Sequence, residues 1–394
     1  MGNSQNRLDG EADGPDSNSD KSVNFNSFKI LRSIGKGSFG KVCMVQKQSN
    51  GRLFAMKYLN KVSCIKQNFV ENVKREISML CLLKHDFIVN LWYTFQDEED
   101  FFIVVDLLLG GDLRYHLSKH VLFTEDDVRL YILEMASVLD YLKSKCIIHR
   151  DIKPDNILLD DKGHAHLTDF NVATILDSED ELATGFAGTK PYVAPDVCQS
   201  KLGKSKGYSF NVDWWSLAIT MFELLRHKRP FKISNETTVE ETMEIFSEGR
   251  VSFSSTWSQA LIDLFLKLFV LDGSKRLSTY SDLQNHEFCQ DTKLENMKPH
   301  FIPSNKHLNY DPTYELEEMM IESKPLHKKK QRIKKQRESK RRETNKPEDP
   351  NNKQVDNSNN MNDENHSDLF ITFNRDLNDL KPDEDLSKER CQTY

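Results

Sequence analysis

From Phe28 onward, apolar positions alternate with polar ones in short runs, and this period of two predicts β-strands. Five such runs precede Gly110-Gly111, interrupted once, at residues 69–83, by apolar positions of helical spacing. The strand-like runs cover residues 28–34, 41–46, 53–59, 91–95 and 102–107. In the helix-like run, apolar residues three and four positions apart would share one face of a helix. These residues are Val70, Val73, Ile77 and Leu80.

Beyond Gly111 the pattern becomes helical. Long segments with apolar residues every three or four positions cover residues 125–144, 212–225 and 257–271. A five-stranded lobe followed by a mostly helical lobe is an α+β arrangement. We expect a cleft near residues 106–112, where one pattern gives way to the other.

Both ends of the chain lack the apolar content of a core. Residues 1–22 are rich in Gly, Asp, Asn and Ser, and the sequence beyond Asn345 is rich in Asn, Asp and Lys. Such segments bury too little apolar surface to offset the entropy of the chain, so we expect them to be disordered. The folded part is expected to end near Phe288.

The net charge of −7 over 394 residues conceals two blocks of opposite sign. Residues 328–342 hold ten Lys or Arg against the single Glu338, whereas 343–394 hold thirteen acidic residues against six basic ones.

No apolar run reaches the length of a membrane span, and the polar N-terminus does not resemble a signal peptide. Seven scattered cysteines without a CxxC pair predict free thiols in a reducing compartment. We therefore expect a cytoplasmic or nuclear protein.

A glycine-rich segment joins the first two predicted strands. It reads Gly35-Lys36-Gly37-Ser38-Phe39-Gly40-Lys41-Val42. A GxGxxG pattern alone is weak evidence, because loops produce it by chance and dinucleotide folds share it. Here it connects strand to strand rather than strand to helix. That connection favours a hairpin whose backbone N–H groups cover phosphates.

Lys57 lies within the third predicted strand, and Glu76 lies nineteen residues on, in the first predicted helix. An unpaired ammonium among the apolar neighbours of Lys57 would be costly, so we expect Glu76 to pair with it. An ammonium oriented in this way could hold the α- and β-phosphates of a nucleotide.

The segment His149-Arg150-Asp151-Ile152-Lys153-Pro154-Asp155-Asn156 is followed by Asp169-Phe170-Asn171. Asp151 is our candidate general base, and Lys153 would neutralise charge on the transferring phosphoryl group. Asn156 and Asp169 supply the hard oxygen ligands that Mg²⁺ prefers, with Mn²⁺ as a substitute. A polar surface turn would explain residues 149–156 alone, but not the whole ordered set from Gly35 to Asp169.

This ordered set resembles a eukaryotic protein kinase domain over residues 28–288. The resemblance continues through Ala194-Pro195-Asp196, Asp213-Trp214-Trp215-Ser216 and Arg276. Three features resemble the YANK-type kinases of the AGC group of serine/threonine kinases. They are Asp-Phe-Asn at 169–171, Gly188-Thr189-Lys190-Pro191-Tyr192, and the tail Asn309-Tyr310-Asp311-Pro312-Thr313-Tyr314-Glu315-Leu316-Glu317-Glu318.

The resemblance implies a two-lobed fold that binds ATP with Mg²⁺ and phosphorylates Ser or Thr hydroxyls of protein substrates. Thr189 would bridge Asp151 and Lys153, and the backbone of residues 106–108 would form the hinge. The implied ATP-binding residues are Ile34, Gly35, Lys36, Gly37, Ser38, Phe39, Gly40, Val42, Ala55, Lys57, Asp106, Leu108, Asp112 and Leu158. Asp112, together with Asp155, suggests a preference for Arg or Lys upstream of the acceptor.

The implied domain organisation has a kinase domain at its centre. It comprises a disordered segment 1–22, a kinase domain 23–288 with its small lobe to about residue 105, an AGC-like tail 289–326, a basic then polar segment 327–368, a docking segment 369–375 and a disordered end 376–394.

The chain departs from the usual kinase pattern at two regulatory positions. Asn171 stands where most kinases have Gly, and Asn is the residue other than Gly best tolerated at positive φ. Gly185 stands where AGC kinases usually carry a phosphorylated Thr or Ser that pairs with the arginine equivalent to Arg150. Activation without phosphate, phosphorylation of Thr184, and the acidic run 177–181 as a surrogate all remain open.

Both ends carry candidate localisation or docking signals. Gly2 half-fits N-myristoylation, and the basic block 328–342 could add attraction to an anionic membrane, act as a nuclear address or be a solvated helix. Phe370-Ile371-Thr372-Phe373-Asn374 resembles the AGC hydrophobic motif, with Asn374 in place of its phosphorylated residue.

The sequence thus predicts an active serine/threonine kinase that is monomeric and does not bind nucleic acid. Two alternatives remain open: a nucleotide-binding pseudokinase scaffold, and a membrane or nuclear adaptor that acts through its basic tail.

Overall fold

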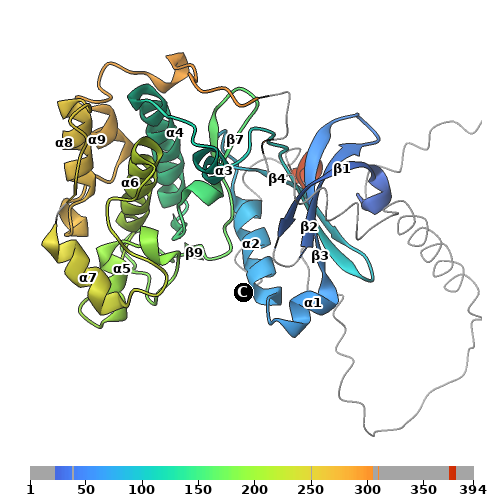
Figure 1. Ribbon diagram of the computed structural model, residues 1–394. Coiled ribbons are helices and arrows are strands. Elements are labelled where there is room, and N and C mark those ends of the chain that lie inside the picture. Colours follow the sequence, from blue (N-terminus) through green and yellow to red (C-terminus); the bar gives the residue numbers. More distant parts are fainter. Residues whose placement is uncertain (1–22, 38–39, 250, 305–308, 310–371, 379–394) are drawn as a thin grey trace, which may run out of the picture.

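The computed structural model describes residues 23–37, 40–249, 251–304, 309 and 372–378 (Figure 1). Gly2, the basic block 328–342, most of the tail 289–326, and Phe370 and Ile371 lie outside these ranges, so the proposals made for them stay predictions. Within the described ranges, no helix is both long and apolar enough to cross a membrane.

The small lobe is an antiparallel sheet in the order β1-β2-β3-β5-β4-β10. Its strands are β1 (Phe28–Gly37), β2 (Gly40–Lys47), β3 (Leu53–Asn60), β4 (Leu91–Gln96), β5 (Asp100–Val105) and β10 (Phe373–Asn374). The register pairs Lys57 of β3 with Val42 of β2 on one side and with Ile103 of β5 on the other. Lys57 is therefore held at the centre of the sheet, where both neighbouring strands fix its position.

Helix α2 (Val70–Leu82) packs on this sheet through the face that the sequence predicts. Val73, Ile77 and Leu80 are buried, and Glu76 is buried on the same helix. A short helix, α1 (Lys61–Lys66), precedes α2 and was not predicted; Asn60 caps it by accepting a hydrogen bond from the Ser63 amide. Helix α2 thus carries Glu76 towards β3.

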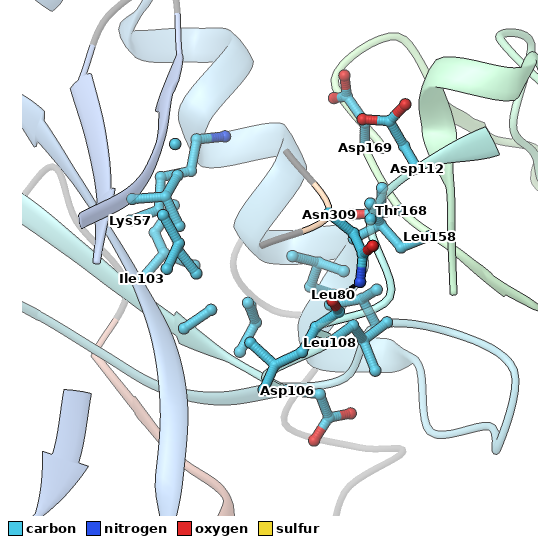
Figure 2. Close-up of a pocket in the computed structure, with 18 of the residues that line it drawn as sticks. Lys57, Leu80, Ile103, Asp106, Leu108, Asp112, Leu158, Thr168, Asp169 and Asn309 are labelled. Carbon is cyan, nitrogen blue, oxygen red and sulfur yellow. Dashed lines mark hydrogen bonds between the residues drawn. The ribbon is translucent and has the colours of Figure 1, made fainter. Parts of the chain in front are cut away.

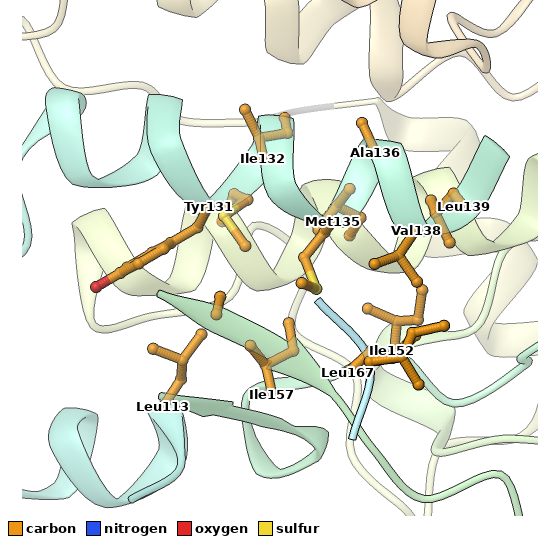
Figure 3. Packing of buried hydrophobic residues seen from close by; sticks show 14 of the residues in the cluster. Leu113, Tyr131, Ile132, Met135, Ala136, Val138, Leu139, Ile152, Ile157 and Leu167 are labelled. Carbon is orange, nitrogen blue, oxygen red and sulfur yellow. The ribbon is translucent and has the colours of Figure 1, made fainter. Parts of the chain in front are cut away.

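The large lobe is mainly helical. Its helices are α3 (Leu113–Ser118), α4 (Glu125–Ser144), α5 (Pro195–Lys201), α6 (Asn211–Arg226), α7 (Val239–Glu248), α8 (Gln259–Leu268) and α9 (Tyr280–Gln284). Its two-stranded sheets pair β6 (Ile147–Ile148) with β9 (Thr174–Ile175), and β7 (Ile157–Leu159) with β8 (Ala165–Leu167). Helix α4 buries Met135 and Val138 on the side that faces Ile157 of β7 and Leu167 of β8 (Figure 3). This core anchors the loops that carry the catalytic side chains, and the α+β expectation is confirmed.

Three predicted element ends are wrong. The helix expected over 257–271 begins at Gln259, because Ser258 accepts a hydrogen bond from the Leu261 amide and caps it. It ends at Leu268, although the apolar residues continue. The strand expected to reach residue 107 ends at Val105. Apolar runs do not by themselves mark the capping residue that ends an element.

The chain continues past Phe288 in an ordered segment that runs back across the helical lobe, drawn in orange in Figure 1. Phe301 packs edge-on against His116 and Phe123, with ring centroids 4.8 and 5.3 Å apart, and its amide donates to Asp127. Asn309 is buried and donates through Nδ2 to the Leu109 carbonyl. A second distant segment, residues 372–378, lies along β4, where Phe373 pairs with Thr94.

Candidate active site

A cavity of about 380 Å³ lies between the two lobes (Figure 2), a size that suits a nucleotide-sized ligand. Its walls are mostly apolar, with Lys57, Glu76, Asp106, Asp112 and Asp169 as charged members. The predicted residues that line it are Ile34, Gly35, Val42, Ala55, Lys57, Asp106, Leu108, Asp112, Leu158 and Asp169. Ser38 and Phe39 lie outside the described residues, and Lys36, Gly37 and Gly40 belong to the β1–β2 hairpin without being among the lining residues.

Several lining residues were missed by the sequence reasoning. They are Leu80, Val89, Ile103, Val105, Leu109, Gly111, Thr168 and Asn309. Leu80, Ile103 and Val105 are apolar residues of a helix or strand, where nothing in the sequence separates a cavity wall from a core. Gly111 has φ +76°, and an added Cβ there would come within 2.1 Å of the Asn309 carbonyl oxygen. Glycine at this position therefore lets residue 309 close one wall of the cavity.

The hinge offers its backbone to the cavity. The Asp106 carboxylate accepts hydrogen bonds from the Asn90 amide at 3.0 Å and from Trp92 Nε1 at 2.6 Å. Together with the Asp106 amide, which donates to the Asn90 carbonyl at 3.1 Å, these bonds tie the hinge to β4 and to the residue before it.

Lys57 and Glu76 form the predicted ion pair. The Lys57 Nζ lies 3.0 and 3.1 Å from the two carboxylate oxygens of Glu76. Burial alone would lower the pKa of Lys57, but the charge and hydrogen bond of Glu76 outweigh it and raise this pKa above its ordinary value. Lys57 is therefore a fixed cation in the cavity wall, as phosphate binding requires.

The backbone of the catalytic loop is held by Asp213 at the start of α6. Its two carboxylate oxygens accept hydrogen bonds from the His149 and Arg150 amides, each 2.8 Å long. Burial raises the pKa of Asp213, and these two donors oppose that rise. Arg150 has φ +68°, a strained conformation for a residue other than glycine. The sequence named Asp213 as part of a motif but gave it no role, because a positioning contact across sixty residues leaves no local pattern.

Asp151, Lys153 and Thr189 form a closed network beside the cavity. Lys153 Nζ donates to Asp151 Oδ2 at 2.7 Å and to Thr189 Oγ1 at 2.8 Å. Thr189 Oγ1 donates to Asp151 Oδ1 at 2.7 Å, and its amide donates to the same oxygen at 2.9 Å. An added Cβ at Gly188 would come within 2.2 Å of the Arg150 carbonyl oxygen, so the preceding glycine allows this close approach. The structure thus brings together the three residues that the resemblance linked.

The surroundings of Asp151 favour its charged form. Burial alone would raise its pKa, but the hydrogen bonds from Lys153 and Thr189 outweigh burial and lower the pKa below its ordinary value. A carboxylate that remains charged near neutral pH can orient an acceptor hydroxyl and take up its proton late in the reaction.

Asp169 and Asn156 fit the role of ligands for a divalent cation. Oδ1 of Asp169 is buried without a hydrogen-bond partner, and Asp169 faces the cavity in Figure 2. Asn156 donates through Nδ2 to the carbonyl and the Oδ2 of Asp151, which leaves its amide oxygen for a cation. Among the described residues there is no group of three or more His, Cys, Asp or Glu side chains that could hold a metal. A cation bound here would therefore need phosphate oxygens and water to complete its shell, as Mg²⁺ usually does.

The backbone after Asp169 corrects one expectation. Asn tolerates positive φ better than other residues except Gly, but here Asp169 is the residue with φ +65°, and Asn171 is not among those with positive φ. Phe170 is fully buried and packs edge-on against His149 at 4.8 Å. In this conformation the backbone at Asn171 therefore does not need the conformational freedom of glycine.

Arg150 is engaged without a phosphate. It donates from Nε to the Val172 carbonyl at 2.7 Å and from Nη1 to the Tyr208 hydroxyl at 3.2 Å. That hydroxyl donates in turn to the Thr184 carbonyl at 3.5 Å, beside Gly185. Ala183 and Tyr208 also form an isolated antiparallel bridge. Tyr208 thus links Arg150 to the segment in which AGC kinases usually carry a phosphate.

Comparison with known proteins agrees with this geometry. The model of the protein kinase domain matches residues 28–289. Over 316 residues the chain is 54% identical to serine/threonine-protein kinase 32C of Mus musculus, covering 79% of this chain and 64% of that protein. It is equally identical to serine/threonine-protein kinase 32B of Homo sapiens, covering 76% of that protein. It is 34% identical over 312 residues to the cAMP-dependent protein kinase catalytic subunit of Dictyostelium discoideum. The chain belongs to the protein kinase family and, within it, to the YANK-type serine/threonine kinases of the AGC group.

Proposed function

We propose that this chain is an active kinase that transfers the γ-phosphate of ATP to Ser or Thr hydroxyls of proteins. Lys57 holds the α- and β-phosphates, and Lys153 neutralises charge on the group in transfer. Asp151 orients the acceptor hydroxyl and accepts its proton. Asp169 and Asn156 hold a divalent cation, which supplies charge neutralisation to the phosphates; the hard oxygen ligands favour Mg²⁺, with Mn²⁺ as a substitute.

One observation carries the proposal. An ionised Asp151, bonded to Lys153 and Thr189, lies beside an Asp169 whose buried Oδ1 has no partner in the part of the chain that the structure describes. A buried carboxylate oxygen left unpaired is costly unless a ligand completes it. This arrangement favours catalysis over a pseudokinase scaffold, which needs nucleotide binding alone.

The experiment compares the wild-type protein with Asp151→Asn on a Ser/Thr peptide array with ATP and Mg²⁺. Loss of the base should lower the rate of transfer by about 10²–10⁴-fold, while the affinity for ATP stays unchanged. Wild-type protein that binds ATP but transfers no phosphate to any peptide would instead establish that the protein is a pseudokinase scaffold. Replacing Mg²⁺ by Mn²⁺ in the same assay tests the choice of cation.

Our proposals for localisation, oligomeric state and substrate preference rest on the sequence. A cytoplasmic monomer, with membrane contact through an acylated Gly2 and the basic block 328–342, remains our proposal. Membrane pelleting of the wild type and of Gly2→Ala tests it: equal pelleting of the two would remove acylation from the account. A preference for Arg or Lys upstream depends on whether Asp112 and Asp155 are open to a substrate.

A further inference from the structure

Arg114 of α3 has its guanidinium enclosed by acidic and phenolic groups from three separate segments. Its Nε lies 3.2 Å from Asp155 Oδ2, and its Nη1 lies 2.9 Å from Glu223 Oε1. Its Nη2 lies 2.5 Å from the Tyr192 hydroxyl and 3.3 Å from Glu223 Oε2. A guanidinium with four such contacts is a fixed part of the surface.

These partners flank the place where an acceptor must approach. Asp155 lies in the catalytic loop, directly before the proposed cation ligand Asn156. Tyr192 lies three residues after Thr189, which donates to Asp151. The cluster is therefore connected to the catalytic loop and to the segment of Thr189, which are the two segments that hold the base.

The acids of this cluster are neutralised from within the chain. Asp155 and Glu223 carry two negative charges, and Arg114 carries one positive charge against them. Arg229 supplies a second positive charge, and its guanidinium carbon lies 5.8 Å from the centre of the Tyr192 ring. The formal charge of the cluster is thus zero. The Glu223 side chain is only 9% exposed and also accepts a 2.5 Å hydrogen bond from Tyr192, so it has little free surface for a further cation.

Asp112 also has a hydrogen-bond partner within the chain. It caps α3 by accepting a 2.6 Å hydrogen bond from the Tyr115 amide. Burial raises the pKa of Asp112 above its ordinary value, and the hydrogen bond from the Tyr115 amide opposes that rise.

We propose that Arg114 is a specificity-determining residue that occupies, from inside the chain, an acidic cluster able to bind a basic side chain of the acceptor. The wild-type enzyme then accepts peptides without Arg or Lys upstream, contrary to what Asp112 and Asp155 suggest in the sequence. Removing Arg114 should leave Asp155, whose side chain is 45% exposed, and Glu223 without their cation and create a preference for Arg. This inference rests on the proposed kinase activity.

The test uses peptide pairs that differ only in Arg or Ala at one position upstream of the acceptor Ser, scanned over several positions. For the wild type, the ratio of kcat/KM for the Arg peptide to that for the Ala peptide should stay within about twofold at every position. In Arg114→Met, which keeps similar bulk without charge, the ratio should rise about tenfold at one position, as one new charge-assisted contact allows. Arg114→Lys keeps the charge and should behave more like the wild type.

Two further variants keep the test decisive. Arg114→Met/Asp155→Asn should lose the gain, because the exposed acid is gone. Arg229→Met removes the second cation without unpairing Glu223, and should give a smaller rise even where Arg114→Met folds poorly. A ratio unchanged in both active single variants, or a strong Arg preference in the wild type, overturns the inference. Absence of transfer to any peptide by the wild type would overturn the proposed function instead.

Discussion

Two polar clusters border the acceptor site, and they differ in whether their acidic groups are paired within the chain. The catalytic cluster leaves one buried carboxylate oxygen, Asp169 Oδ1, without a partner and directs it into the cavity. The Arg114 cluster pairs its acids with cations of the same chain. The catalytic cluster consists of Asp151, Lys153, Asn156, Asp169 and Thr189. The Arg114 cluster consists of Arg114, Asp155, Tyr192, Glu223 and Arg229.

The difference shows how to read acidic residues near a catalytic loop. An acid with an unpaired buried oxygen needs a ligand to satisfy it, whereas the charge of an acid paired within the chain is already balanced by its partner. Sequence alone gives both kinds the same appearance. Asp155 and Asp169 are fourteen residues apart, yet the structure assigns them to opposite categories.

The largest effect should follow from removing the unpaired carboxylate. Asp169→Asn should slow phosphoryl transfer by about 10²–10³-fold, because the cation loses a charged ligand beside the phosphates. It should also weaken the dependence of ATP binding on Mg²⁺, measured by titration calorimetry with and without the cation. Asp161→Asn changes an exposed acid in the turn between β7 and β8 and serves as the control. Unchanged Mg²⁺ dependence in Asp169→Asn would remove this residue from the cation site.

A smaller effect is expected from the bridge within the catalytic cluster. Thr189→Val keeps the shape and the backbone amide but removes the hydroxyl that joins Asp151 to Lys153. One lost hydrogen bond of this kind should lower kcat about three- to tenfold. Thr189→Ser keeps the hydroxyl and should retain most of the rate. Equal rates for the Val and Ser variants would show that the bridge is dispensable.

The smallest effect should come from Tyr208, which joins Arg150 to the segment around Gly185. Tyr208→Phe should reduce kcat about threefold, because Arg150 loses one of its two contacts in that region. Wild-type protein treated with phosphatase should keep its activity, since this link needs no phosphate. A large loss on phosphatase treatment would point instead to a modified residue such as Thr184.

Much of the fold follows from the sequence, because the period of two and the period of about 3.6 are set by which side chains are buried. The five predicted strands and α2, α4 and α6 are present in the structure. The short helices α1 and α3 were missed, because a span of six residues shows too little periodicity. The return of residue 309 to the hinge and the pairing of β10 with β4 are contacts between distant segments, which local patterns do not encode.

The candidate site was predictable wherever one residue type serves one chemical task. Lys57 with Glu76, and Asp151 with Lys153 and Thr189, lie together as the motifs and the resemblance implied. The roles of Asp213, Arg114 and Tyr208 were not predictable, because each acts by pairing with a partner on another segment. Their neighbours in the sequence are ordinary core or surface residues.

The most direct test measures kcat/KM for the Arg and Ala peptides with the wild type, Asp151→Asn and Arg114→Met side by side. If phosphoryl transfer and peptide selection depend on separate clusters, Asp151→Asn lowers kcat/KM for both peptides by one common factor of about 10²–10⁴. Arg114→Met should instead change mainly their ratio, in favour of the Arg peptide. Transfer by Asp151→Asn at the wild-type rate, or a ratio that Arg114→Met leaves unmoved, would contradict this account.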